Sequence, residues 1–143
     1  MPSTPENKFI ASIHRHIPQV YKEKMHNTYR GGTPDVYYSG NLGDIWVEYK
    51  YLSRLPKQVL PNLSALQQVW LNSRHAEGRN VMVIVGWADG GVILTNREWM
   101  VPMDKEVCIA RSLHRKEVAA FILSKTGVQH DVCPSDLFIG EPS

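Results

Sequence analysis

The chain has 143 residues, of which 43% are hydrophobic and 21% charged, and these proportions are ordinary for a soluble globular protein. Its formal net charge of +2 is too small to indicate nucleic-acid binding by charge alone, and no apolar run approaches the roughly 18 residues that a membrane span needs. This length predicts a single domain, 1–143, and the order of elements given below divides it into a core over about 5–87 and C-terminal additions over 88–143.

The first predicted element is a helix that begins near Ser3. Ser3 and Glu6 have the spacing of a capping box, and Pro5 is tolerated in a first helical turn. Apolar residues then recur at helical spacing until Pro18. The next segment, 20–29, fits either a short strand or a helical turn.

A β-hairpin is predicted next. Its strands are 36–38 and 45–47, joined by the turn-like stretch 39–43. If the turn is centred on Asn41 and Leu42, then Asp35 lies directly opposite Glu48, with Cβ atoms about 5 Å apart. Lys50 projects from the same face as Glu48, because side chains two residues apart on a strand share a face. The hairpin therefore predicts two carboxylates and an amine on one surface.

Alternation along the hairpin separates an apolar face from a polar one. One face holds Val36, Tyr38, Ile45, Val47 and Tyr49. The other holds Asp35, Tyr37, Trp46, Glu48 and Lys50. We expect the first face to join the core and the second, which carries the charges, to line a cleft.

Beyond the hairpin, a proline-punctuated loop is expected at 52–61, and helical spacing then runs from Leu63 to near Gly78. The continuous apolar run 81–85 predicts a buried strand, and 92–94 is expected to pair back on it.

The last third predicts a weak strand at 107–110 and a final helix between a cap at Ser112 and Gly127. The apolar side of that helix is a candidate subunit interface. The order of elements predicts an α/β fold with a mixed central β-sheet flanked by helices.

The opposed acids favour a metal site over ordinary structural roles. Asp35 alone fits a turn cap, but two like charges placed opposite each other destabilise a sheet unless a cation lies between them. Glu48 lies in an apolar strand, where a carboxylate needs a partner. Lys50 does not supply that partner easily, whereas Arg30 or Lys57 would. Carboxylate ligands match Mg²⁺ or Mn²⁺ better than zinc.

These residues resemble the PD-(D/E)XK nuclease superfamily and, within it, the virus-type replication-repair nuclease (VRR-NUC) group. Pro34-Asp35 is similar to the first acidic motif, and Glu48-Tyr49-Lys50 to the second. The matching stretches, in the order typical of the group, are Arg30-Gly31-Gly32-Thr33-Pro34-Asp35, Trp46-Val47-Glu48-Tyr49-Lys50, Leu63-Ser64-Ala65-Leu66-Gln67 and 81–85. The resemblance covers about 6–86, and its one departure is the loop that precedes Gln67.

The resemblance implies a restriction-endonuclease-like core (αβββαβ) and metal-dependent phosphodiester hydrolysis. Asp35 and Glu48 would bind Mg²⁺ or Mn²⁺ with the Tyr49 backbone carbonyl. Lys50 would orient the attacking water or stabilise the transition state.

Glu6 and Gln67 complete the implied catalytic set, and each has an ordinary alternative. Glu6 matches the acid that the superfamily carries on its first helix, but it fits a capping box equally well. Gln67 would position Lys50 or the water, with Gln68 as a rival. We interpret His14 and His16 as surface or phosphate-facing groups.

The implied substrate is duplex or branched DNA, including Holliday junctions, in phage or bacterial replication, recombination or repair. Arg30, Arg54 and Lys57 flank the hairpin and are the expected substrate contacts. No base-reading motif is present, so binding through phosphates and shape is expected. Symmetric cutting of two strands predicts a homodimer or a higher homo-oligomer. RNA remains an alternative substrate.

Cys108 and Cys133 lack zinc-ligand spacing and fit reduced thiols in a cytoplasm. The family resemblance implies that this is the cytoplasm of a bacterium or of a phage-infected host. Two other functions stay open. One is a catalytically inactive nucleic-acid-binding module on the same fold, and the other is an interaction protein whose acidic pocket binds a partner.

Overall fold

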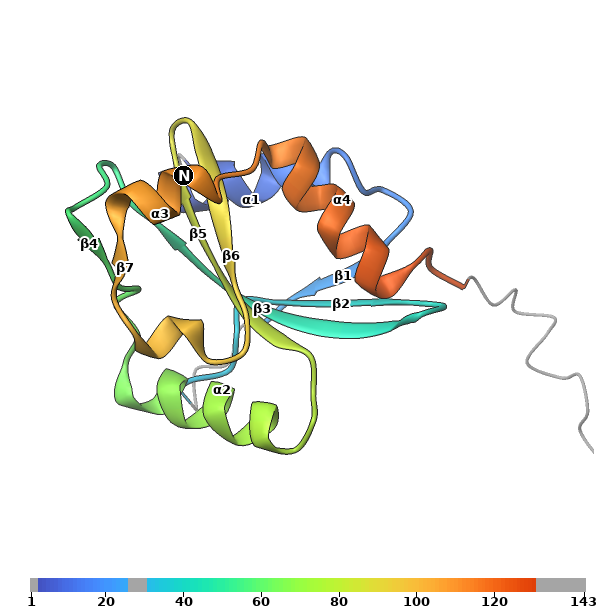
Figure 1. Cartoon of the computed structure of the whole chain (residues 1–143). Coiled ribbons are helices and arrows are strands. Elements are labelled where there is room, and N and C mark those ends of the chain that lie inside the picture. The colour runs from blue at the N-terminus through green and yellow to red at the C-terminus, as the bar shows by residue number, and fades with distance from the viewer. Residues whose placement is uncertain (1–2, 26–30, 131–143) are drawn as a thin grey trace, which may run out of the picture.

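The structure, a computed structural model, describes residues 3–25 and 31–130. A five-stranded sheet runs through it (Figure 1). Its strands, in spatial order, are β1 (Tyr21–Lys24), β2 (Val36–Gly40), β3 (Gly43–Tyr51), β5 (Val81–Trp87) and β6 (Gly90–Leu94). The sheet is mixed, because β3 and β5 pair in parallel whereas the other neighbours are antiparallel. The predicted mixed central sheet is therefore confirmed.

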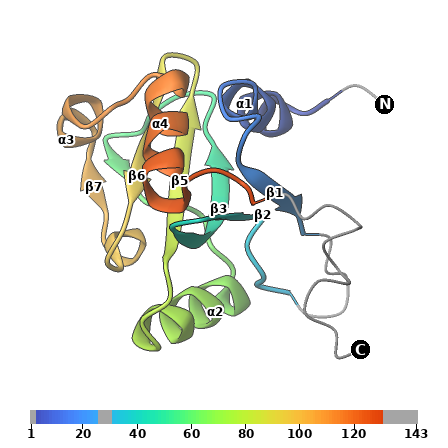
Figure 2. The same cartoon turned by 90° about the vertical axis from the view of Figure 1, so that its right-hand side faces the viewer.

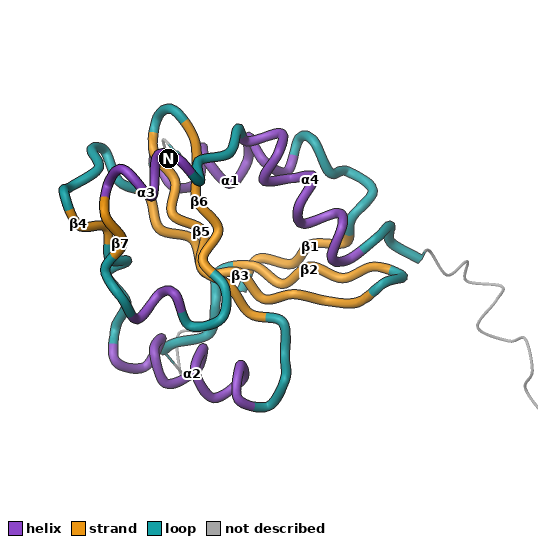
Figure 3. Tube along the Cα trace, in the orientation of Figure 1, coloured by secondary structure: helices purple, strands orange, loops and turns teal. Residues whose placement is uncertain are grey.

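Helices cover both faces of the sheet. Helices α1 (Pro5–His14) and α4 (Arg115–Thr126) lie on one face, and α2 (Ala65–Ala76) lies on the other (Figures 1 and 2). A small lobe flanks the sheet, in which β4 (Gln58–Val59) pairs with β7 (Met103–Asp104), as Figure 3 shows. The same lobe holds η1 (Glu98–Met100) and α3 (Lys105–Ala110).

Two hydrophobic clusters fill the space between these layers. The apolar face of the hairpin packs with α1 and α4, and all five of its predicted core residues are buried. The second cluster lies on the α2 side and includes Leu71, Trp99 and Cys108. Strand β5 supplies both clusters, so all seven of its residues are buried, as expected for a strand covered on both faces.

The hairpin has the predicted register. Val36 pairs with Val47 and Gly40 with Gly43, which leaves Asn41 and Leu42 as the two turn residues. The tip of the hairpin is held by the end of α4, because the Asn41 N–H donates to Val128 O at 2.9 Å. The Leu42 N–H likewise donates to Thr126 O at 2.8 Å. The tip of the hairpin is thus tied to the last residue of α4 and to the segment that follows it.

Two helix starts differ from the predictions. Helix α1 is capped by Thr4, whose side chain accepts from the Asn7 N–H at 3.1 Å, so Ser3 and Glu6 form no capping box. Helix α4 begins after His114 rather than after Ser112. In both places a later residue provides a side-chain acceptor, or a capping box, closer to the first helical turn.

The predicted strand at 107–110 is wrong, because these residues belong to α3. A run of four apolar residues cannot distinguish a strand from one side of a short helix. Only Cys108 of this run is buried, while Val107 and Ile109 are half exposed.

The apolar side of α4 is internal, which removes it as a subunit interface. Val118, Ala119 and Ile122 are at most 1% exposed and belong to the first hydrophobic cluster. Across 3–25 and 31–130, the helices are all too short or too polar to cross a bilayer. Cys133 lies outside the described residues.

Candidate active site

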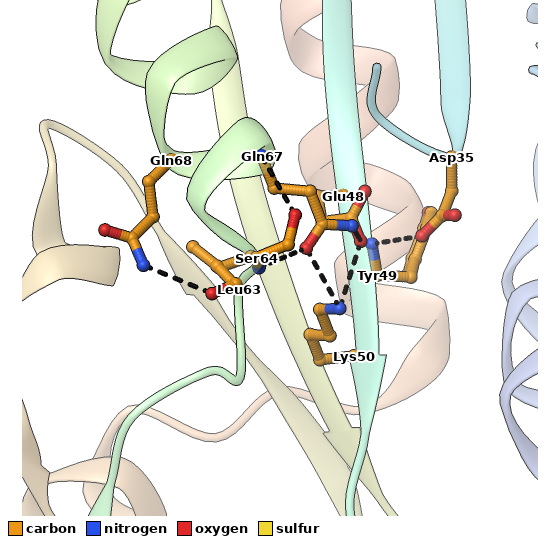
Figure 4. Close-up of polar contacts among 8 residues, drawn as sticks. All are labelled: Asp35, Glu48, Tyr49, Lys50, Leu63, Ser64, Gln67 and Gln68. Carbon is orange, nitrogen blue, oxygen red and sulfur yellow. Dashed lines mark hydrogen bonds and ion pairs between the residues drawn. The ribbon is translucent and has the colours of Figure 1, made fainter. Parts of the chain in front are cut away.

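The candidate site lies where α2 crosses the polar face of β3 (Figure 4). Lys50 Nζ is 3.4 Å from Glu48 Oε2, and Gln67 Nε2 donates to the same Glu48 oxygen at 3.0 Å. Gln67 Oε1 accepts from Lys50 Nζ at 3.4 Å. The three side chains therefore form a closed triangle. The expectation that Lys50 would not easily partner Glu48 was wrong, because both side chains bend toward Gln67.

The capping of α2 fixes Gln67 in this triangle. Ser64 accepts from the Gln67 N–H at 3.1 Å, and Gln67 Oε1 accepts from the Ser64 N–H at 2.9 Å, which completes a capping box. Its rival Gln68 points away from the site and donates to Leu63 O at 3.1 Å. The long loop before α2 therefore does not displace Gln67 from the expected position.

Asp35 approaches Glu48 from the edge of β3 that pairs with β2. Strand β2 begins at Val36, so the pairing of β3 with β2 ends at Val47. The Asp35 carboxylate takes over at this point and accepts the Tyr49 N–H at 2.8 Å. Because the N–H and C=O of one strand residue point to the same neighbour, the Tyr49 carbonyl is directed toward the Asp35 side as well.

Glu6 joins the two hairpin acids from the second residue of α1. Its pKa is raised by burial and by the charge of Asp35, with which it is close enough to share a hydrogen bond. The pKa of Asp35 is also raised, mainly by burial, although the Tyr49 N–H opposes the shift. Three carboxyl groups, from α1, from the residue before β2 and from β3, thus meet at one place.

Glu48 is the most perturbed of these acids. It is 3% exposed, and burial, followed by the charge of Asp35, raises its pKa to about 8 despite the neighbouring Lys50 ammonium. Its second oxygen, Oε1, is buried and has no hydrogen-bond partner within 3–25 and 31–130. Buried polar atoms are normally paired, so this oxygen is an acceptor that a bound cation would satisfy.

The site fits a hard divalent cation. Crowded carboxylates and an unpaired buried oxygen are the groups that such an ion would satisfy, and oxygen ligands suit Mg²⁺ or Mn²⁺. Within the described residues no three His, Cys, Asp or Glu side chains are arranged to hold a metal by themselves. The protein ligands would therefore be Asp35, Glu48 and the Tyr49 carbonyl, with water completing the shell.

The structure describes two of the three predicted substrate contacts, Arg54 and Lys57. Arg54 and Lys57 are exposed in the loop after β3, and within the described residues neither forms an ion pair with the three acids. Arg54 instead lines a hollow near Asp89 and Lys105. Arg30 lies outside the described residues.

A buried polar chain beneath the site was missed from the sequence. The Tyr38 hydroxyl contacts the Tyr49 hydroxyl at 2.5 Å and His14 Nε2 at 2.7 Å. Burial and two nearby lysines lower the pKa of His14 to about 4, so this half-buried ring is neutral at pH 7 and faces Tyr38 rather than a phosphate. The available signal was the placement of Tyr38 and Tyr49 on the apolar face, because buried hydroxyls need partners.

Comparisons with known proteins support the fold. No protein-family model and no curated protein matches the chain. Among solved structures, it is similar to Hjc, a Holliday junction resolvase from the archaeal hyperthermophile Archaeoglobus fulgidus. The identity is 16% and the TM-score 0.54, over 82% of this chain and 97% of the resolvase. This likeness shows a shared fold, in agreement with the sheet and helix layers described above.

Proposed function

We propose that the chain is a metal-dependent deoxyribonuclease of the PD-(D/E)XK superfamily. One observation carries the proposal: Asp35 and Glu48 converge beside Lys50, and an unpaired buried Glu48 oxygen lies among them. The fold similarity to a Holliday junction resolvase supports it, as does the order of the motifs. The VRR-NUC group, whose motifs suggested it, is the finer assignment that we propose.

The chain's own residues divide the work of hydrolysis. When bound, Mg²⁺ or Mn²⁺ supplies a water of lowered pKa and positive charge next to the phosphate. The Lys50 ammonium, held by Gln67 Oε1, would orient the attacking water and stabilise the negative charge that builds on the phosphate oxygens. Gln67 would keep Glu48 and Lys50 in register, and Glu6 would hold a water or a second ion at the edge of the site.

Branched DNA is the proposed substrate. The similar solved structure is that of a Holliday junction resolvase, and the chain offers no sequence-reading motif, so we infer recognition by phosphates and shape. Paired incisions require two active sites, so we propose that the working form is a homodimer or a higher homo-oligomer. Its interface would lie away from the buried side of α4.

The test is a cleavage assay on linear, flapped and four-way DNA, and on matched RNA, with Mg²⁺, Mn²⁺ or EDTA. We expect metal-dependent incision that prefers branched DNA. Asp35→Asn and Lys50→Ala should each lower the rate by at least about 10²-fold while the protein still folds and binds DNA. Glu106→Gln, which changes an exposed carboxylate on α3, is the matched control. Full activity of Lys50→Ala would exclude the mechanism.

An inactive module or an interaction protein is the competing function. Titration calorimetry with Mn²⁺ separates these possibilities, because only the nuclease requires metal binding that Asp35→Asn abolishes. Heat of binding that is equal in both proteins would favour the alternatives.

A further inference from the structure

A second polar cavity lies away from the carboxylates. It has a volume of about 400 Å³ and opens between the end of α2, the start of β5 and the last turn of α4. Its polar and aromatic lining includes His75, Arg79, Asn80, Asn96, Phe121 and Lys125. We call this the basic cavity, because two cations and an imidazole line it and, among the described residues, no acidic side chain does.

The two cations of the basic cavity are not neutralised by any carboxylate in the described part of the chain. Among residues 3–25 and 31–130, neither Arg79 nor Lys125 has a carboxylate partner. Arg74, one turn earlier on α2, differs because Glu77 pairs with it at 2.8 Å. Lys125 lies over the Phe121 ring at 5.4 Å from its centre, which holds the ammonium at the wall of the cavity. As far as the structure describes the chain, Arg74 is therefore paired, whereas Arg79 and Lys125 are available to a ligand.

The composition of the cavity favours a phosphate on a larger ligand. Side-chain amides and two free cations are donors suited to phosphate oxygens, and the half-buried Phe121 adds an apolar surface. An acidic protein patch would pair with the cations alone and would make no use of a hollow with amide donors.

The basic cavity and the acid site lie on one strand. Ile45 borders the cavity and Glu48 lies three residues later on β3, which corresponds to about 10 Å along the strand, with the two side chains on opposite faces of the sheet. A nucleic acid bound at the acids can reach the cavity only by extending around the edge of the molecule. One arm of a branched DNA would follow such a path.

We infer that the basic cavity binds a backbone phosphate of a DNA arm, remote from the bond that is cut. The inference rests on the proposed function for the identity of the ligand. Binding here anchors the substrate and plays no part in chemistry, so it acts on affinity and on KM rather than on kcat.

The test compares two double variants with exposed, matched charges. Arg79→Gln/Lys125→Gln removes the cations of the cavity, whereas Arg15→Gln/Lys116→Gln removes an arginine and a lysine elsewhere. Binding to a four-way junction is measured in EDTA over a range of salt concentrations. For the cavity variant we expect at least about tenfold weaker binding and a salt slope shallower by about 1, because the one phosphate contact that is lost contributes about 0.9.

Equal affinity and slope in the two double variants would overturn the inference. Inorganic phosphate, titrated while the amide signals of Gly78 and Asn96 are followed, tests a free-anion site: saturation at micromolar phosphate, without help from DNA, would also overturn it. A protein that binds junctions but cuts nothing would remove the proposed function and leave this result intact. If cleavage occurs, the cavity variant should keep its kcat at saturating DNA.

Discussion

At the scale of single residues, Glu48 contributes an electrostatic conflict to the metal-free protein. The unfolded chain releases the Glu48 proton near the ordinary pKa of 4.5, whereas the folded chain keeps it up to about pH 8. The folded state thus binds more protons between these values, and stability falls as the pH rises through this window. The folded protein is therefore expected to gain stability when the charge of Glu48 is removed.

Glu48→Gln should therefore stabilise the metal-free protein, by about 1–3 kcal/mol at pH 8 and by less at pH 5. The introduced amide would keep an oxygen that accepts from Gln67 while losing the charge. The measurement is urea unfolding in EDTA at both pH values, with Glu106→Gln as a control. A variant less stable than the wild type at pH 8 would show that Lys50 compensates Glu48 fully.

His14 gives a pH dependence of opposite sign. Its folded pKa of about 4 lies below the ordinary 6.5, so the unfolded chain takes up the proton first as the pH falls. Stability should decrease between about pH 6.5 and pH 4, by about 1–2 kcal/mol, since the ring is partly solvated. His14→Gln should flatten this part of the stability curve. An unchanged slope would mean that carboxyl groups alone set the acid limb.

At the scale of elements, the first turn of α2 combines two roles in Gln67. Its side chain closes the capping box with Ser64 and also contacts Glu48 and Lys50. Glutamate preserves the capping box, whereas alanine does not.

At pH 5, where Glu48 keeps its proton, Gln67→Ala should lose about 1 kcal/mol of stability and Gln67→Glu should retain it, because only the first loses the cap. Both should lower kcat, since neither donates to Glu48. Thermal unfolding and single-turnover cleavage separate the two effects. Equal stability of the variants would show that the cap contributes little, and wild-type kcat in Gln67→Glu would remove the positioning role.

The hairpin tip packs closely against the end of α4 at two glycines, Gly40 and Gly127. A Cβ at Gly40 would collide with the backbone carbonyls of Thr126 and Gly127. At Gly78, by contrast, nothing lies within 4 Å, although its φ of 83° disfavours other residues.

Gly40→Ala should consequently cost about 2–3 kcal/mol, and Gly78→Ala only about 1 kcal/mol, because one has steric and the other only conformational strain. Chemical denaturation measures both. Similar losses at the two positions would show that the tip yields easily to make room.

At the scale of the whole molecule, the sequence predicted those features that depend on alternation and local spacing. The hairpin register, the buried β5 and the Gln67 helix follow from such patterns. The β4–β7 pair could not be predicted, because two-residue strands distant in sequence carry no period. The wrong prediction of a strand at 107–110, which is helical, has the same origin, because this run is too short to show its period.

The candidate site was predicted in its members but not in its contacts. Asp35, Glu48 and Lys50 were placed by strand geometry, whereas the Glu48–Gln67 contact depends on how closely α2 approaches β3. The basic cavity was not predicted for the same reason: its imidazole comes from α2 and its two cations from the loop after α2 and from α4, which only the tertiary fold brings together. Local periodicity says nothing of such meetings.

Because the two-residue tip is hydrogen-bonded to the carbonyls of Thr126 and Val128, the lengths of the two hairpin strands are fixed. Inserting one residue in β3 before Glu48 would turn that carboxylate to the tyrosine side of the sheet and aim Tyr49 at the acids. Inserting one residue in each strand would restore the facing of Asp35 and Glu48 but push the tip beyond the carbonyls of 126–128 that receive it. Descendants of this chain should therefore vary in their loops and keep the twelve-residue interval between those acids unchanged.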